Sequence, residues 1–148
     1  MSLKAQITED MKSAMRAKDS ARLNAIRLLQ AAMKQREVDE RIELDDTQVI
    51  EVIEKMLKQR RDSISQYEAA NRQDLADAEK FEVGVLSTYL PLPLSDEEIA
   101  SLLDGVIAET GAAGVKDMGK VMAAIKPKIV GRADVAKVSG LIKARLAG

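Results

Sequence analysis

The residues of this sequence that could do chemistry are its carboxylates, amines and hydroxyls. The chain has 148 residues and contains no cysteine, no histidine and no tryptophan. This composition excludes disulfide bonds, thiol nucleophiles, zinc sites built on Cys or His, and every catalytic triad that needs an imidazole. Carboxylate pairs for acid–base catalysis stay open, because spatial pairing is not visible in a sequence. No residue is singled out as catalytic.

One glycine–lysine motif has the spacing of a phosphate-binding loop. Gly114, Gly119 and Lys120 match the pattern G-x-x-x-x-G-K. The motif also needs Ser or Thr after the lysine to hold magnesium, and a buried strand before the loop, whereas Val121 follows here and a glycine-rich turn precedes. We interpret the spacing as a helix-capping coincidence and expect no cofactor.

An acidic cluster is the second feature with possible chemistry. It consists of Asp39, Glu40, Glu43, Asp45 and Asp46. Hard cations prefer several oxygen ligands, but the cluster has no glycine where a calcium loop turns tightly. We interpret it as a solvated, charged loop between helices and predict no metal site.

The basic C-terminal segment is the feature that best indicates a ligand. Residues 116–148 contain eight basic and two acidic residues, a net charge of +6 in a chain whose total is -1. Such a segment attracts a polyanion, although helix C-termini also favour Lys and Arg. With only three aromatic residues in the chain, base stacking is disfavoured, and phosphate recognition of structured RNA is expected. The predicted RNA contacts are Lys116, Lys120, Lys126, Lys128, Arg132 and Lys137, with Lys126 and Lys128 presented together at a corner formed by Pro127.

Glycine and proline divide the chain into two parts. Residues 1–83 contain neither, and the prolines begin at Pro91 and Pro93, which cannot continue a helix. We therefore predict a helical N-terminal domain at 1–90, a proline-containing linker at 91–94 and a tail domain at 95–148.

The periodicity of apolar residues predicts an all-α fold. Four helices are expected in the N-terminal domain, at about 4–17, 20–35, 46–70 and 74–89. Three are expected in the tail, at about 96–110, 118–127 and 135–146. Ser95 and Glu98 form a capping box for the first of these, and Asn71 is expected in a left-handed conformation. Gly140, inside the last helix, suggests close approach of another helix.

Two segments resemble a known family. Residues 117–128, with Gly131, Arg132 and Asp134 behind them, resemble the YqeY family and the tail domain of the GatB subunit of glutamine-dependent tRNA amidotransferases. Residues 58–64 and 89–91 also resemble the YqeY pattern. Val135 departs from it, because the family often has glycine there.

The resemblance implies a non-catalytic accessory protein that binds tRNA during aminoacyl-tRNA synthesis or tRNA-dependent amidation. A protein-interaction module that docks on an aminoacyl-tRNA synthetase or amidotransferase subunit is an alternative. Carbon–nitrogen ligase activity with glutamine as amide donor is a second alternative, by family association only. No DNA or membrane partner is expected. Without an apolar run of about 20 residues or a leader pattern, a cytoplasmic location is expected.

Overall fold

The computed structural model describes residues 2–147, and the chain forms two compact units, Met1–Leu90 and Pro91–Gly148. Seven α-helices and one short 3-10 helix account for the regular structure of the described residues, which contain no strand. The predicted all-α class is confirmed. Each unit has its own apolar core.

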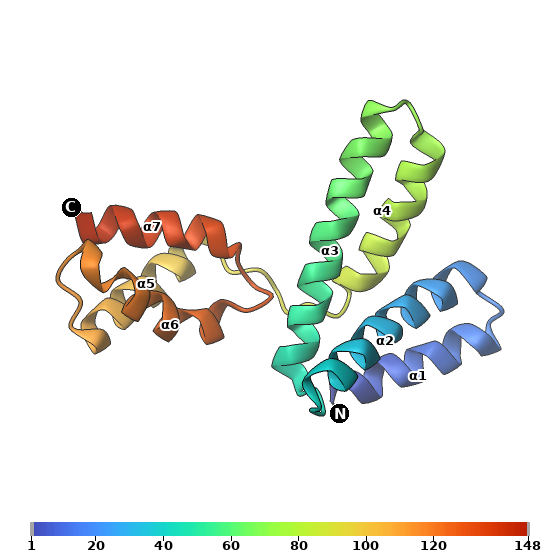
Figure 1. Ribbon diagram of the computed structural model, residues 1–148, viewed down its shortest axis with the longest axis horizontal. Coiled ribbons are helices and arrows are strands. Elements are labelled where there is room, and N and C mark those ends of the chain that lie inside the picture. The colour runs from blue at the N-terminus through green and yellow to red at the C-terminus, as the bar shows by residue number, and fades with distance from the viewer. Residues whose placement is uncertain (1, 148) are drawn as a thin grey trace. The chain divides into compact units, whose positions relative to one another are not determined.

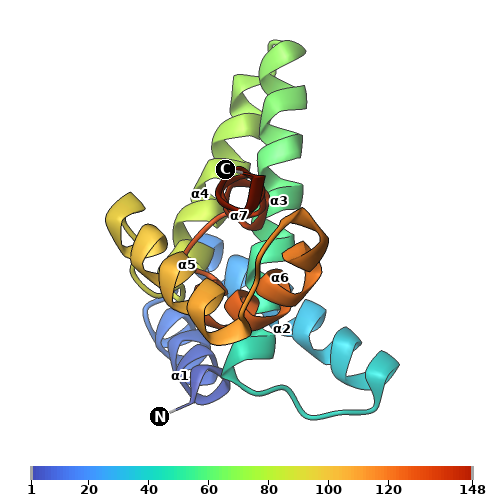
Figure 2. The same cartoon turned by 90° about the vertical axis from the view of Figure 1, so that its left-hand side faces the viewer.

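The N-terminal unit consists of two antiparallel helix pairs. Its helices are α1 (Leu3–Arg16), α2 (Ser20–Glu40), α3 (Asp46–Ala69) and α4 (Gln73–Ser87). Figures 1 and 2 both show α3 and α4 side by side as a hairpin. At the turn between them Asn71 has φ 58°, as the left-handed prediction requires. The fully buried side chains of this unit include Ile7, Ile26, Leu29, Ile53, Leu57 and Leu86.

Helix α2 is longer than the sequence predicted. It continues past Gln35 to Glu40, and Arg41 ends it in a left-handed conformation at φ 55°. An Arg36–Glu40 ion pair stabilises this last part, since residues four apart are neighbours on a helix surface. No glycine or asparagine marks the end, so the sequence carried no stop signal there. The charged loop is therefore shorter than predicted.

The tail unit consists of α5 (Asp96–Thr110), the 3-10 helix η1 (Val115–Asp117), α6 (Met118–Ile129) and α7 (Val135–Ala147). Helix α6 packs against both α5 and α7. Figure 2 looks nearly along α7, with α5 and α6 below it. The buried core of the unit comprises Ile99, Leu103, Val106, Val121, Ile125, Ile129, Val138 and Ile142.

The ends of the tail helices follow the sequence in one case and depart from it in another. Ser95 and Glu98 form the predicted capping box at the start of α5. Helix α6, however, does not stop at Pro127 but includes it and continues to Ile129. A proline in the last turn removes a single backbone donor, and the complete burial of Ile125 and Ile129 holds the turn against the core.

The close helix approach suggested for Gly140 is wrong. A Cβ built at Gly140 would meet no heavy atom within 4 Å. The residue lies on the exposed side of α7. Helix packing is therefore not the reason for this glycine.

Candidate nucleic-acid interface

All six predicted RNA contacts lie on the second half of the tail unit. Lys116 is in η1, Lys120, Lys126 and Lys128 are in α6, Arg132 is in the turn that follows, and Lys137 is in the first turns of α7. Five of the six are exposed, and Arg132 is half-buried. The six cations fall into two groups of three: those that lie beside a carboxylate of α5 and those that do not.

Three of the six cations lie beside carboxylates of α5. The pairs are Lys128–Glu109 at 3.9 Å, Arg132–Glu98 at 3.9 Å and Lys137–Asp96 at 2.9 Å. The shortest pair is also a hydrogen bond, and the Lys137 ammonium lowers the pKa of the Asp96 carboxyl below its ordinary value. These three cations are already partly neutralised within the tail.

The other three cations, Lys116, Lys120 and Lys126, have no carboxylate within ion-pair distance in the described part of the chain. Asp117 lies near the first two. A hydrogen bond from the Ala113 backbone N–H, then the positive charges of Lys116 and Lys120, lower the pKa of its carboxyl. Among the six predicted contacts, these three lysines are the most available to an external anion.

Lys126 and Lys128 do not share a corner. Both lie in α6, and residues two apart on an α-helix point about 200° from each other around its axis. The buried stripe through Ile125 and Ile129 separates their two sides. One flat ligand surface therefore does not meet both side chains through this helix alone.

Arg132 has a structural contact that the sequence did not indicate. Its Nε donates a hydrogen bond to the carbonyl oxygen of Leu92 at 2.8 Å, and its own carbonyl accepts one from the N–H of Leu94 at 2.8 Å. Arg132 thus holds the proline-containing connector against the tail unit. Its guanidinium is only partly free for another ligand.

The charge of the tail is separated between its two halves. Residues 91–115 carry five acidic and no basic side chains, whereas residues 116–148 carry eight basic and two acidic ones. The tail as a whole has a net charge of only +1. An anion is therefore attracted to η1, α6 and α7 and repelled by α5.

The phosphate-loop spacing lies in a helical context. Gly114 follows the end of α5, and η1 leads directly into α6, so no strand aims the loop. Asp117 makes no side-chain cap on α6, because its Oδ2 accepts the N–H of Ala113 at 2.9 Å. The arrangement does not form the cradle of backbone N–H groups that binds phosphates in such loops.

A charged cluster in the N-terminal unit was not found from the sequence. Arg60 of α3 lies 2.7 Å from Glu82 and 3.4 Å from Glu79, both on α4. Burial, the strongest influence, raises the pKa of Glu82, as Glu79 also does, while Arg60 lowers it. Arg60 lies in one of the segments that resemble the YqeY pattern, but only the fold shows which carboxylates it meets. The cluster joins the two helices of the hairpin.

The described residues contain neither a candidate metal site nor a candidate membrane span. Between residues 2 and 147, no group of three or more carboxylates is placed to hold a metal ion. Within the same range, no helix is long and apolar enough to cross a membrane.

The amino-acid sequence matches one protein family over nearly its whole length. The family described as Yqey-like protein matches residues 4–146, which is nearly the whole chain. The chain therefore belongs to the YqeY-like family, and its resemblance to the YqeY family is confirmed.

Curated relatives with the name "Altered inheritance of mitochondria protein 41, mitochondrial" are similar to this chain. The protein of Vanderwaltozyma polyspora is 32% identical over 119 residues, which cover 76% of this chain and 64% of the relative. That of Lachancea thermotolerans is 34% identical over 108 residues, covering 71% and 58%. That of Pyrenophora tritici-repentis is 31% identical over 138 residues, covering 89% and 76%. The chain thus spans less than two thirds of the first two relatives.

The expectation of a cytoplasmic location is wrong in the light of these relatives, which are named mitochondrial proteins. The expectation rested on the lack of a membrane span and of a leader pattern. The lack of a membrane span and the lack of a leader pattern are not positive evidence for any compartment, because the absence of a targeting signal does not identify where a protein is located.

Proposed function

We propose that the tail unit binds the phosphate backbone of structured RNA, with tRNA as the first candidate, in a non-catalytic accessory role. The observation that carries the proposal is the separation of charge in the tail. Among the described residues, it leaves Lys116, Lys120 and Lys126 without carboxylate partners on the half that carries the +6 charge. The accessory role in aminoacyl-tRNA synthesis or tRNA-dependent amidation follows from the family resemblance.

The mode of binding follows from the side chains available. Lysine ammonium groups contact phosphates as point charges, and phosphate contacts position a protein without reading sequence. We therefore expect similar affinity across tRNA species. Three phosphate contacts correspond to a log-log dependence of affinity on salt with a slope of about -2 to -3.

The roles of the two groups of cations differ in the proposal. Lys116, Lys120 and Lys126 are primary contacts. Lys128, Arg132 and Lys137 are secondary contacts, because RNA phosphates must compete with the carboxylates of α5 for them. Exposed ion pairs are weak, with typical strengths of about 0 to 1 kcal/mol, so this competition lowers their contribution without abolishing it.

A mobility-shift titration with unfractionated tRNA at two salt concentrations tests the proposal. Changing Lys116, Lys120 and Lys126 to Glu should abolish the shift at low salt. The matched control changes three exposed lysines of the N-terminal unit, Lys12, Lys55 and Lys58, to Glu, which keeps the net charge of the two variants equal. Absence of any shift by the unaltered chain at low salt, or equal losses in both variants, would contradict it.

We expect the chain alone to carry out no amide transfer. Amide transfer from glutamine needs a nucleophile that hydrolyses glutamine and a site that activates the acceptor with ATP and magnesium. We expect the purified chain to release no ammonia from glutamine, with or without tRNA and ATP. If glutamine hydrolysis activity co-purifies with the chain, the proposed accessory role is replaced by an enzymatic one.

A further inference from the structure

A groove runs between α5 and α7 of the tail unit. The two helices point in the same direction and are held in register, since Asp96 pairs with Lys137 and Asp104 pairs with Arg145 at the same offset of 41 residues. Two turns of helix separate the two ion pairs, which corresponds to about 12 Å. The groove is therefore a slot of defined length with an ion pair across each end.

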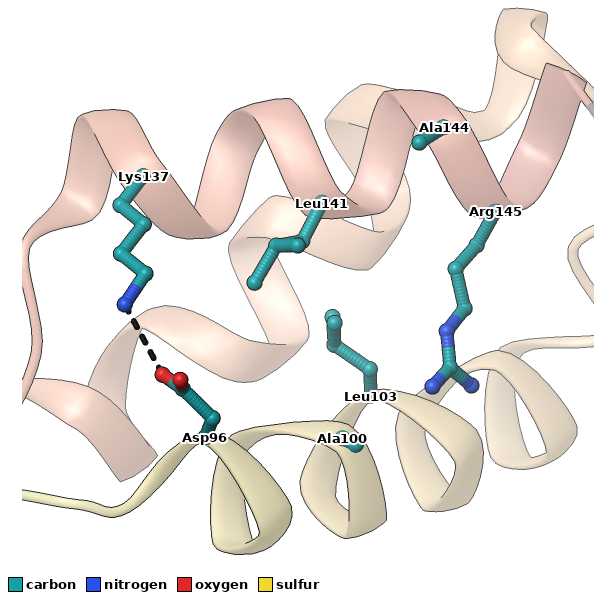
Figure 3. A pocket seen from close by; sticks show the side chains of 7 residues that line it. All are labelled: Asp96, Ala100, Leu103, Lys137, Leu141, Ala144 and Arg145. Carbon is teal, nitrogen blue, oxygen red and sulfur yellow. Dashed lines mark hydrogen bonds and ion pairs between the residues drawn. The ribbon is translucent and has the colours of Figure 1, made fainter.

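The wall and floor of the slot between the ion pairs are apolar. They are formed by Ala100 and Leu103 of α5 and by Leu141 and Ala144 of α7 (Figure 3). The slot has a volume of about 450 Å³. Leu103 at its floor is 1% exposed, whereas Leu141 on its wall is 38% exposed. An alanine on each wall leaves room for side chains of another molecule.

The two walls have opposite charge. The α5 wall carries Asp96 and Asp104, and the α7 wall carries Lys137 and Arg145. These side chains are 37 to 84% exposed, so their ion pairs are weak enough to exchange partners. A ligand that fits must be apolar in the middle, basic on the side of α5 and acidic on the side of α7.

We propose that this groove docks an amphipathic α-helix of a partner protein. Leucine-sized side chains one turn apart enter between Ala100 and Ala144, the acidic flank of the helix lies along α7, and its basic flank lies along α5. Turning such a helix end to end exchanges its flanks, so the charged walls also fix its direction. Helix-in-groove docking of this kind uses anchors at i and i+3 or i+4.

The dimensions of the slot favour a helix over a second copy of the chain. A stable homodimer needs about 800 Å² of buried surface on each partner, and a slot two turns long supplies much less. Two turns of helix with one or two anchors fit a slot of about 12 Å along their axis. The inference goes beyond the proposed RNA binding and depends on different atoms, apart from Lys137.

Fluorescence anisotropy with three labelled peptides tests the charge requirement. Each peptide is an amphipathic helix of about 16 residues, since shorter isolated helices are marginal in water. All three carry the same leucine anchors. One has an acidic and a basic flank, one has two acidic flanks and one has two basic flanks. We expect the mixed peptide to bind about tenfold more tightly than either other, and equal binding by all three would overturn the charge argument.

Two substitutions in the full chain test the location without changing its charge. Ala144→Phe fills the slot, and Leu141→Ser removes its largest exposed apolar wall. Each should weaken the mixed peptide by about tenfold or more, and each should leave the tRNA shift unchanged. The matched control, Ala123→Phe, places the same ring on an exposed position of α6 that does not line the slot.

The outcomes separate this inference from RNA binding. Peptide binding that survives both slot variants, or no peptide binding at all, overturns it. Self-association of the chain that Ala144→Phe abolishes, in the absence of peptide binding, would assign the slot to a second copy instead. Loss of the tRNA shift in the lysine variants has no bearing on the slot, because none of those lysines lines it.

Discussion

At the scale of single residues, one poorly exposed cluster of charged side chains joins α3 to α4. Arg60 faces two carboxylates, Glu79 and Glu82, in a place where all three side chains are at most 25% exposed. Removing the single cation of such a cluster lowers the free energy of unfolding more than removing one of its two anions does. Without the cation, two like charges are left close together where little water can solvate them.

We expect Arg60→Met to lower the free energy of unfolding by about 2 kcal/mol, less than the loss of about 3 to 5 kcal/mol for breaking a fully buried pair, because the cluster is only partly buried. Glu82→Gln should cost less than half as much, since burial has already raised the pKa of Glu82 and made its charged form unfavourable. Urea unfolding of both variants at neutral pH measures the difference. An equal loss in the two variants would contradict this account.

The carboxylate of Glu37 should make the stability of the fold depend on pH. Its carboxylate accepts hydrogen bonds from the Lys4 ammonium at 2.7 Å and the Leu44 backbone N–H at 3.0 Å, which lower its pKa below 4.5. Because the pKa of Glu37 is lower in the folded chain than in the unfolded chain, its carboxylate stabilises the fold at any pH above the unfolded-state pKa. This stabilisation is lost as the pH falls through the pKa of the folded state. Glu37→Gln should therefore be less stable than the unaltered chain at pH 7, with the gap closing below pH 4.5. A gap that stays constant in urea titrations down to the acid limit would refute it.

At the scale of helices, the ends and glycines of the tail show where backbone conformation limits the sequence. Gly111 ends α5 with φ 66°, in the left-handed region where a Cβ is unfavourable. Gly140 lies in the middle of α7, with open space around it and helical neighbours on both sides. The same residue type is therefore required at one position and only tolerated at the other.

Gly140→Ala should raise the free energy of unfolding by about 0.5 to 1 kcal/mol, because alanine loses less backbone entropy in a helix and meets no neighbour here. Gly111→Ala is the matched control and should be destabilising, since alanine is strained at that φ. Circular dichroism during urea unfolding measures both changes. A loss of stability in Gly140→Ala would mean that this position contacts another helix after all.

At the scale of the whole molecule, the connector between the two units is tied to the tail. Leu92 is 82% exposed, yet its carbonyl accepts the Arg132 Nε–H, and the next leucine donates its N–H to the Arg132 carbonyl. Arg132 thus holds, through its side chain and its backbone carbonyl, a segment that would otherwise be an accessible target for proteases.

Arg132→Ala should make proteolysis of the connector several-fold faster, with cleavage between Leu90 and Ser95. The fragments 1–90 and 91–148 should both persist, since each unit has its own buried core. Lys128→Ala is the control, because it removes a nearby cation that does not contact the connector. Thermolysin digestion followed by mass spectrometry identifies the products. An unchanged rate in Arg132→Ala would show that its hydrogen bond does not protect the connector.

The sequence by itself determined the helices, because their signals are local. Apolar residues at helical spacing, the Ser95 capping box and the left-handed Asn71 all act within one or two turns of the chain. The end of α2 at Arg41 was missed because no local stop signal marks it. The passage of α6 through Pro127 was missed because burial of Ile125 and Ile129 against the core overrode the local effect of proline. The basic segment was also visible, as a property of composition.

Only the tertiary structure decided what each charged residue contacts. Asp96 and Lys137 are 41 residues apart, and nothing in their local sequence indicates that they pair. The same holds for Arg132 and the Leu92 carbonyl, and for the slot between α5 and α7. Helix formation depends on neighbours within about four residues, whereas these contacts depend on which faces the helices bury against each other. The physical reason is that the packing of helices against each other decides which carboxylates and carbonyls lie beside a cation. This packing cannot be deduced from any single stretch of sequence.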